Sequence, residues 1–162
     1  MRKNKALVFD MDGTIANLYG VEGWLADLRA ENERPYAEAK PLCDMVVINT
    51  LLDILKRMYG YKVIITSWLA KDSTPEFMAR VDKTKREWIE RYEFPADEIN
   101  IVAYGTPKQN VTRNRTFTEQ ILFDDSAEVR KDWDLGRTVD ANGNIVDFLT
   151  ELVEKEMMNV GW

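Results

Sequence analysis

The chain has 162 residues, of which 45% are hydrophobic and 31% charged, and its formal net charge is −6. This predicts one globular domain over residues 1–162, and the acidic balance disfavours tight nonspecific binding to nucleic acid. No apolar run approaches the roughly 20 residues that a membrane span needs. The basic start leads into a short strand and not into a signal-peptide core, so we expect a cytoplasmic protein without a membrane partner.

The numbers of histidines and cysteines limit the catalytic mechanisms that the chain can use. The chain has no histidine, which excludes Ser-His-Asp and Cys-His catalysis and the usual zinc sites. Cys43 is the only cysteine, so no intrachain disulfide can form, and we expect it to be a partly buried apolar residue. Any catalysis must therefore use carboxylates, hydroxyls and lysines.

Strands and helices are predicted to alternate along the chain, beginning with an apolar strand at Lys5–Phe9. The elements expected after it are a helix over 44–59, a strand over 61–66, a helix opening at Ser73 or Thr74 before Pro75, strands over 97–103 and 120–123, a helix over 126–133, a strand over 137–140 and a helix over 145–158. This alternation predicts an α/β fold, a Rossmann-like three-layer sandwich around a parallel sheet. The polar stretch 14–41 breaks the pattern and is interpreted as an insertion with one short helix over 21–29.

Two of these helices carry apolar stripes at helical spacing. The helix over 44–59 is expected to start at Asp44, to stop at Gly60 and to bury Ile48, Leu51, Leu52, Leu55 and Met58. The next helix is expected to bury Phe77, Val81, Trp88 and Tyr92. In that arrangement Lys83 and Lys85 lie on other faces of the helix, toward solvent.

Acids and hydroxyls follow three of the predicted strands. The first strand ends in Asp10-Met11-Asp12-Gly13-Thr14, the second in Thr66-Ser67, and the fourth in Asp124-Asp125-Ser126. In parallel sheets the carboxyl ends of the strands form the ligand site, so these groups are expected to meet.

Asp10 and Asp12 are two residues apart, so in extended chain both side chains share a face. Close carboxylates repel unless a cation or a shared proton settles the charge, which favours a combined metal and acid/base site. A simple turn is the plain alternative, and a calcium loop is disfavoured because its later acidic positions are missing.

Together, these motifs resemble the haloacid dehalogenase (HAD) superfamily, whose members are mostly magnesium-dependent phosphatases. The resemblance implies that Asp10 is the nucleophile, that Asp12 is the general acid and base, and that Thr66 holds a phosphoryl oxygen. It also implies a Mg²⁺ site formed by Asp10, the Asp12 carbonyl and one of Asp124 and Asp125, with Asp125 favoured as the direct ligand.

The same family needs a lysine that bridges the nucleophile and the phosphoryl group. Lys108, which follows the third strand, stands where the family places it, and Lys83 and Lys85 are the alternatives. Ser67 and Trp68 are further candidates for substrate binding, and the other tryptophans are expected in the core. Arg113 and Arg115 either contact a second phosphate or lie in a solvated loop.

The substrate depends on the insertion, which family phosphatases use as a cap. About 28 residues, 17–44, are available here, too few for a full helical cap. This implies an open site or one completed by a second copy of the chain. The layout resembles small nucleotidases and the phosphatase half of polynucleotide kinase–phosphatases. It therefore favours a phosphomonoesterase for a nucleotide or small metabolite, with a 3′-phosphatase for nucleic-acid ends or an inactive binding module as alternatives.

Overall fold

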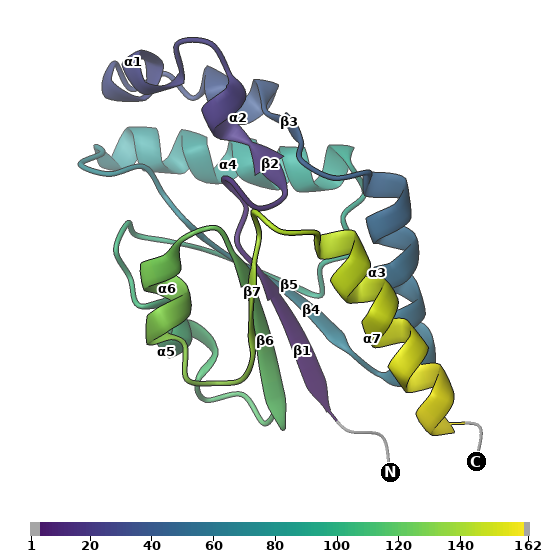
Figure 1. The fold of residues 1–162 in the computed structure, drawn as a ribbon. Helices are drawn as coiled ribbons and strands as arrows, with labels where there is room; N and C mark the ends of the chain where they lie inside the picture. Colours follow the sequence, from purple (N-terminus) through teal and green to yellow (C-terminus); the bar gives the residue numbers. More distant parts are fainter. Residues whose placement is uncertain (1–3, 161–162) are drawn as a thin grey trace.

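The protein, described by a computed structural model over residues 4–160, is built on a central parallel sheet (Figure 1). In this range the strand order is β5–β4–β1–β6–β7. The strands are β1 (Lys5–Phe9), β4 (Lys62–Trp68), β5 (Glu98–Val102), β6 (Glu119–Asp124) and β7 (Thr138–Asp140). The predicted three-layer α/β fold is confirmed, and the order reverses between β1 and β6.

Helices cover both faces of the sheet. One face packs against α3 (Met45–Tyr59) and α7 (Ile145–Val160), and the other against α5 (Lys108–Thr112) and α6 (Ala127–Asp132) (Figure 1). Successive β1 residues alternate between the two cores: Leu7 and Phe9 belong to the larger one, and Ala6 and Val8 to the smaller one. This burial on both sides explains why the strand sequences are almost entirely apolar.

The predicted ends of α3 are confirmed. The Asp44 carboxylate accepts hydrogen bonds from the Val46 and Val47 amides, and Gly60 ends the helix with a φ of 76°. The predicted burial of Met58 is wrong, because its side chain is 57% exposed and the neighbouring Tyr59 is buried instead.

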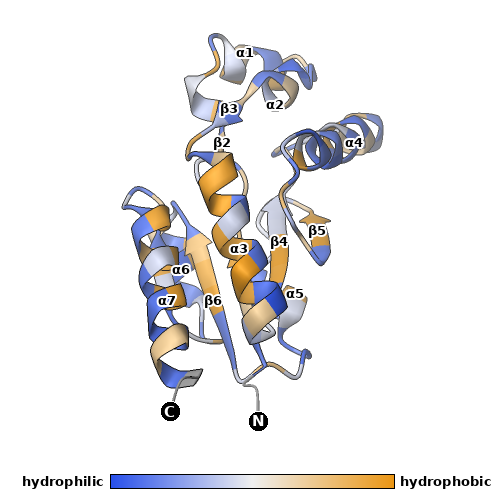
Figure 2. Cartoon of the chain, turned by 90° about the vertical axis from the view of Figure 1, so that its right-hand side faces the viewer, coloured by the Kyte–Doolittle hydropathy of each residue, from blue (hydrophilic) through white to orange (hydrophobic). Residues whose placement is uncertain are grey.

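The next helix, α4 (Pro75–Arg91), is more polar than α3, as Figure 2 shows. Of the two candidate caps, Thr74 is the one used: its Oγ1 accepts a hydrogen bond from the Phe77 amide in the first turn of α4. The predicted strand over 61–66 is longer in the structure, because β4 continues through Ser67 and Trp68.

The insertion forms a small cap over the carboxyl edge of the sheet (Figure 1). This cap segment, Ala16–Pro41, contains the short ribbon β2 (Ala16–Asn17) and β3 (Lys40–Pro41), a 3-10 turn (Leu18–Gly20), α1 (Trp24–Arg29) and α2 (Arg34–Glu38). It is tied to α4, where Trp88 Nε1 donates to the Ala39 carbonyl at 2.7 Å. The cap segment therefore rests on α4. Among residues 4–160, no helix has the length and hydropathy of a membrane span.

Candidate active site

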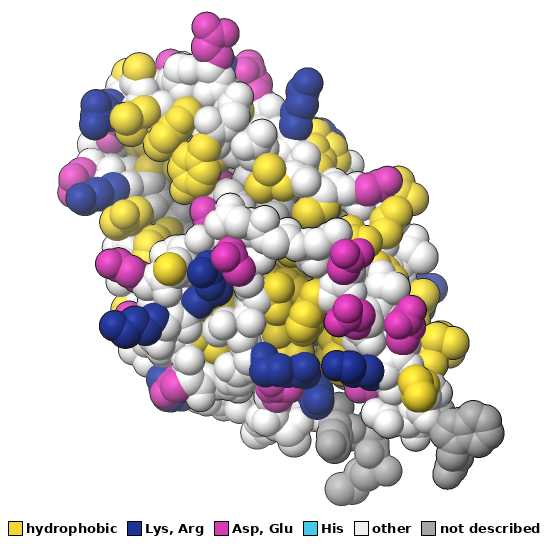
Figure 3. Space-filling view, in the orientation of Figure 1, with side chains coloured by type: hydrophobic (Ala, Val, Ile, Leu, Met, Phe, Trp, Pro, Cys, Tyr) yellow, Lys and Arg dark blue, Asp and Glu magenta, His cyan; other side chains and the backbone are white. Residues whose placement is uncertain are grey.

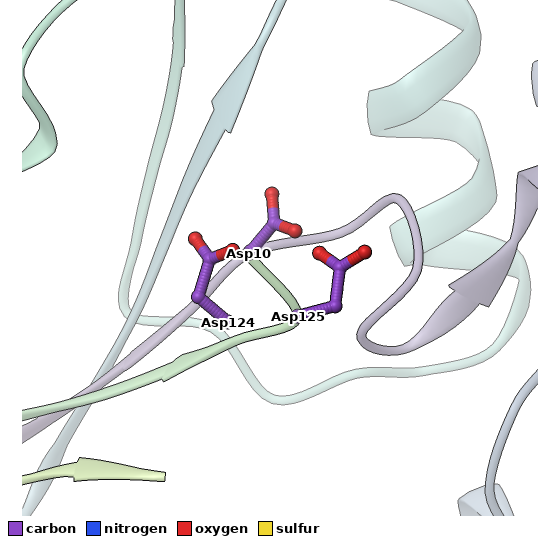
Figure 4. A group of neighbouring side chains, drawn as sticks. All are labelled: Asp10, Asp124 and Asp125. Carbon is purple, nitrogen blue, oxygen red and sulfur yellow. The ribbon is translucent and has the colours of Figure 1, made fainter. Parts of the chain in front are cut away.

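The ends of β1 and β6 bring three carboxylates together. The two strands are neighbours with Phe9 opposite Phe123, and the Asp10 amide donates to the Phe123 carbonyl at 3.0 Å. One carboxylate oxygen each of Asp10, Asp124 and Asp125 lies within 4.8 Å of the others. Figure 4 shows the three side chains pointing to the same side of the strand ends.

Lys108 lies between two of these acids. Its Nζ donates to Asp10 Oδ1 at 2.9 Å and to Asp124 Oδ2 at 2.7 Å, and its side chain is 2% exposed. The Thr14 hydroxyl donates to the other Asp10 oxygen at 3.1 Å. Both oxygens of Asp10 are therefore held, one by Lys108 and the other by Thr14.

The cluster carries more negative than positive charge, with three carboxylates around one ammonium group. Burial and the nearby Asp10 raise the pKa of Asp124, and burial with Asp10 and Asp124 raises the pKa of Asp125 to about 7. Burial alone would lower the pKa of Lys108, but Asp10 and Asp124 raise it overall.

This arrangement fits a divalent cation with oxygen ligands. Mg²⁺ is bound by carboxylates and water, and its charge would offset the repulsion that raises the pKa of these acids. Both Asp124 oxygens already accept hydrogen bonds, from Lys108 and from the Ser126 amide. Asp125 is therefore the more available of the two acids for a cation.

Asp12 lies beside this cluster and faces the cavity described below. Its side chain is 17% exposed, and its Oδ2 accepts a hydrogen bond from Lys85 Nζ at 2.8 Å. Burial raises the pKa of Asp12, against the opposing effect of Lys85. A raised pKa favours the protonated carboxyl that a general acid requires.

The predicted solvent exposure of Lys85 is wrong. Its side chain is 1% exposed and contacts Asp12, whereas Lys83 is 80% exposed as expected. Lys85 falls four residues after Val81 and three before Trp88, so it stands on the apolar stripe of α4. A charged residue on a buried stripe was the sequence signal for this contact.

The three residues at the end of β4, Thr66, Ser67 and Trp68, have different surroundings. Thr66 follows Ile65, which pairs with Phe9, so it stands beside Asp10 in the sheet. Within the part of the chain that the structure describes, its buried Oγ1 has no hydrogen-bond partner. The Ser67 hydroxyl is buried and accepts from Lys85 at 2.8 Å. Trp68 lines the cavity, with Lys108 Nζ 5.1 Å from its ring.

A cavity of about 790 Å³ opens over the carboxylates. Asp10, Asp12, Lys108, Asp124 and Asp125 form its polar end. Its walls come from the cap segment, from the end of β4 with the loop that follows it, and from the loop after β5, and they include Tyr19, Trp24, Leu25, Leu28, Trp68, Leu69 and Tyr104. Figure 3 shows hydrophobic side chains gathered at the upper left, between α1 and the start of α4.

No family model matches the chain. Among solved structures, it is similar to a D,D-heptose 1,7-bisphosphate phosphatase from Burkholderia thailandensis, with a TM-score of 0.55 over 92% of this chain and 98% of that chain. The chain therefore has a HAD-like fold. Sequence identity is 12%, so the likeness concerns the fold. The HAD-like fold places Asp10 and Asp12 directly after the first strand of the sheet, at its carboxyl edge.

The remaining sequence candidates lie away from this edge of the HAD-like fold. Arg113 pairs with Asp134 and Arg115 with Glu98, and neither lines the cavity, which favours the solvated-loop alternative. Trp88 and Trp133 are core residues and Cys43 is partly buried, as expected. Trp24 departs from the core expectation because it lines the cavity, and Trp162 lies outside the described residues.

Gly13 lies in the loop after β1, close to the Asp125 carboxylate. Its φ is +81°, and a Cβ added there would collide with the Asp125 carboxylate and approach Tyr19 Cε2 to 3.0 Å. We expect Gly13→Ala to lower the free energy of unfolding by about 2 to 4 kcal/mol. The positive φ strains the backbone of an alanine, and the contact of the added Cβ with Asp125 contributes a second cost.

Gly105→Ala is the matched control for this prediction, measured by urea denaturation. Gly105 has a similar φ of +85°, and an added Cβ meets nothing within 4 Å. It should cost only the backbone strain, about 1 to 2 kcal/mol. Equal losses for the two variants would contradict the predicted contact between residue 13 and Asp125.

Proposed function

We propose that this protein is a Mg²⁺-dependent phosphoric monoester hydrolase that works through an aspartyl-phosphate intermediate. The observation that carries the proposal is the fixed Asp10 carboxylate at the polar end of the cavity, held by Lys108 and Thr14. A held carboxylate loses little freedom when it attacks, which lowers the entropic part of the barrier. The HAD-like fold supports the assignment.

Asp10 is the nucleophile in the proposed reaction. One of its oxygens attacks phosphorus, the ester P–O bond breaks, and an acyl phosphate forms on Asp10. Lys108 contacts Asp10 at 2.9 Å and is positioned to stabilise negative charge on the transferring group. The buried Thr66 hydroxyl has no hydrogen-bond partner among residues 4–160, and a phosphoryl oxygen bound beside Asp10 would supply one.

Asp12 moves the protons. The departing ester oxygen keeps the bond electrons and takes the Asp12 proton. The Asp12 carboxylate then takes a proton from the water that attacks phosphorus and releases phosphate from Asp10. The raised pKa of Asp12 supports the first of these roles.

Mg²⁺ would be held by Asp10, by Asp125 or Asp124, and by the Asp12 carbonyl. Bound there, it supplies positive charge that offsets the repulsion between an anionic substrate and the acids.

We propose a nucleotide or similar small phosphorylated metabolite as the substrate. A cavity of about 790 Å³ is in the usual range for small-molecule sites. Tyr19 packs on Trp24 with ring centroids 4.9 Å apart, and Trp68 on Tyr104 at 5.0 Å, so the apolar walls carry one aromatic pair from the cap segment and one from the ends of β4 and β5. These walls suit a planar base better than a sugar alone.

A substrate panel tests this proposal. Phosphate release is measured with 5′- and 3′-nucleoside monophosphates, glycerol phosphate and a 3′-phosphorylated oligonucleotide, with Mg²⁺. We expect the highest kcat/KM for a mononucleotide, and Trp24→Leu should raise its KM by about tenfold with little effect on glycerol phosphate. A preference for the oligonucleotide would replace this proposal by a 3′-phosphatase, and no release from any substrate would favour an inactive binding module.

A further inference from the structure

Lys85 is a buried ammonium group to which the proposed reaction gives no role. Its Nζ donates to Asp12 Oδ2 at 2.8 Å, to Ser67 Oγ at 2.8 Å and to the Trp68 carbonyl at 2.7 Å. An ammonium group has three donors, so each already has a partner. Lys85 therefore has no free donor for a substrate phosphate, in contrast to a direct phosphate ligand.

Stability alone does not account for a lysine at this place. Its side chain is 1% exposed and stands on the apolar stripe of α4, among Val81 and Trp88. Removing an ammonium and a carboxylate from water costs several kcal/mol per ion, and apolar residues in place of a buried pair are often neutral or stabilising. A role in placing its partner, Asp12, explains the arrangement better.

We propose that Lys85 is a positioning residue that aims the Asp12 carboxyl at the leaving group; this inference rests on the proposed phosphatase function. Lys85 fixes Oδ2 from the α4 side. Among residues 4–160, this carboxylate accepts a side-chain hydrogen bond through Oδ2 only, and Asp12 lines the cavity. Oδ1 is thus the oxygen that is left to face the substrate.

The surroundings of Lys85 hold this pair rigidly. Ser67 and Trp68 belong to β4, so two of the three partners of Nζ are fixed by the sheet. On the cap side, the ring of Tyr36 lies with its centroid 4.9 Å from Nζ, and Tyr36 is 5% exposed. The ring limits access of water to the pair and adds a cation–π contact. The position of Asp12 therefore depends on β4, α4 and the cap segment together.

The role predicts a dependence on the leaving group. When the ester P–O bond breaks, an alkoxide needs the Asp12 proton, whereas 4-nitrophenolate is stable without it. A misplaced Asp12 carboxyl should therefore slow alkyl phosphates far more than 4-nitrophenyl phosphate. A general loss of structure would slow both substrates alike.

The test compares Lys85→Met with Lys83→Met, its matched control on the exposed side of α4. We expect Lys85→Met to lower kcat for glycerol phosphate by about a hundredfold, the lower range for general acid catalysis, and for 4-nitrophenyl phosphate by less than about tenfold. KM should change little for either substrate, and Lys83→Met should behave as wild type. A crystal structure of Lys85→Met should show the Asp12 carboxyl displaced from its position.

Equal losses for both substrates, or an unmoved Asp12 with unchanged kcat, would overturn the role of Lys85. If Lys85→Met does not fold, Lys85→Arg is measured in its place; it keeps the charge but changes the geometry, and the same two criteria apply. Asp10→Asn, assayed in parallel, separates the two proposals. Full activity in Asp10→Asn would reject the phosphatase mechanism itself, whereas an inactive Asp10→Asn with an unaffected Lys85→Met would reject only the role of Lys85.

Discussion

Asp10→Asn is expected to lower kcat by about four orders of magnitude or more with every phosphate monoester, because a neutral amide does not attack phosphorus. The side chain keeps its shape and can still accept the hydrogen bond from Lys108, which also contacts Asp124. We therefore expect the variant to fold. Phosphate release and circular dichroism, measured on the same preparation, check both statements.

The intermediate gives this prediction a second measurement. Wild-type protein quenched in acid during turnover should carry phosphate on the peptide that contains Asp10, as seen by mass spectrometry. Asp10→Asn should carry none. Asp132→Asn is the matched control, because it removes an exposed carboxylate outside the cluster. A phosphorylated peptide elsewhere in the chain would assign the nucleophile to another residue.

Mg²⁺ removal has the second-largest expected effect. Chelation by EDTA should lower phosphate release by about a thousandfold, since a bound cation contributes several kcal/mol of charge stabilisation. The metal-free protein should also melt at a lower temperature. Saturation at about 100 times Kd adds about 2.7 kcal/mol, which corresponds to about 5 to 10 °C in a domain of this size.

Asp125→Asn separates the metal site from nonspecific salt effects. It removes one of the three clustered carboxylates and leaves the Lys108 contacts to Asp10 and Asp124 in place. We expect the melting-temperature shift with Mg²⁺ to disappear in this variant and to persist in Asp132→Asn. An unchanged shift in Asp125→Asn, followed by a loss in Asp124→Asn, would make Asp124 the direct ligand.

The sequence patterns predicted the regular elements well where their signals are local. Asp44 and Gly60 mark the two ends of α3, and the alternating apolar strands and amphipathic helices gave the three-layer fold. Short elements were missed: α2 and α5 have 5 residues each, too few for a stripe to develop. The exposure of Met58 was also missed, because the spacing of apolar residues does not show where the end of a helix extends beyond the elements that pack against it.

The site was predicted in part. The carboxyl ends of parallel strands share an edge, so the sequence predicted that Asp10, Asp124 and Asp125 would meet there, and the pairing of β1 with β6 in the structure brings them together. The family resemblance selected Lys108, and the structure places it against two of these acids. Ser67 was expected to face the substrate, but in the structure its hydroxyl is turned toward Lys85.

The sequence by itself determined which residues stand at each strand end. An apolar run predicts a buried strand, and the first acidic residue after the run marks where the strand reaches the carboxyl edge of the sheet. The tertiary structure decided which lysine reaches which acid. Lys83 and Lys85 are two residues apart on α4, yet one is 80% exposed and the other 1%. The apolar stripe of α4 marks Lys85 as the buried one, but the acid that it reaches depends on how α4 packs between the sheet edge and the cap segment, because Lys85 and Asp12 lie 73 residues apart in the sequence.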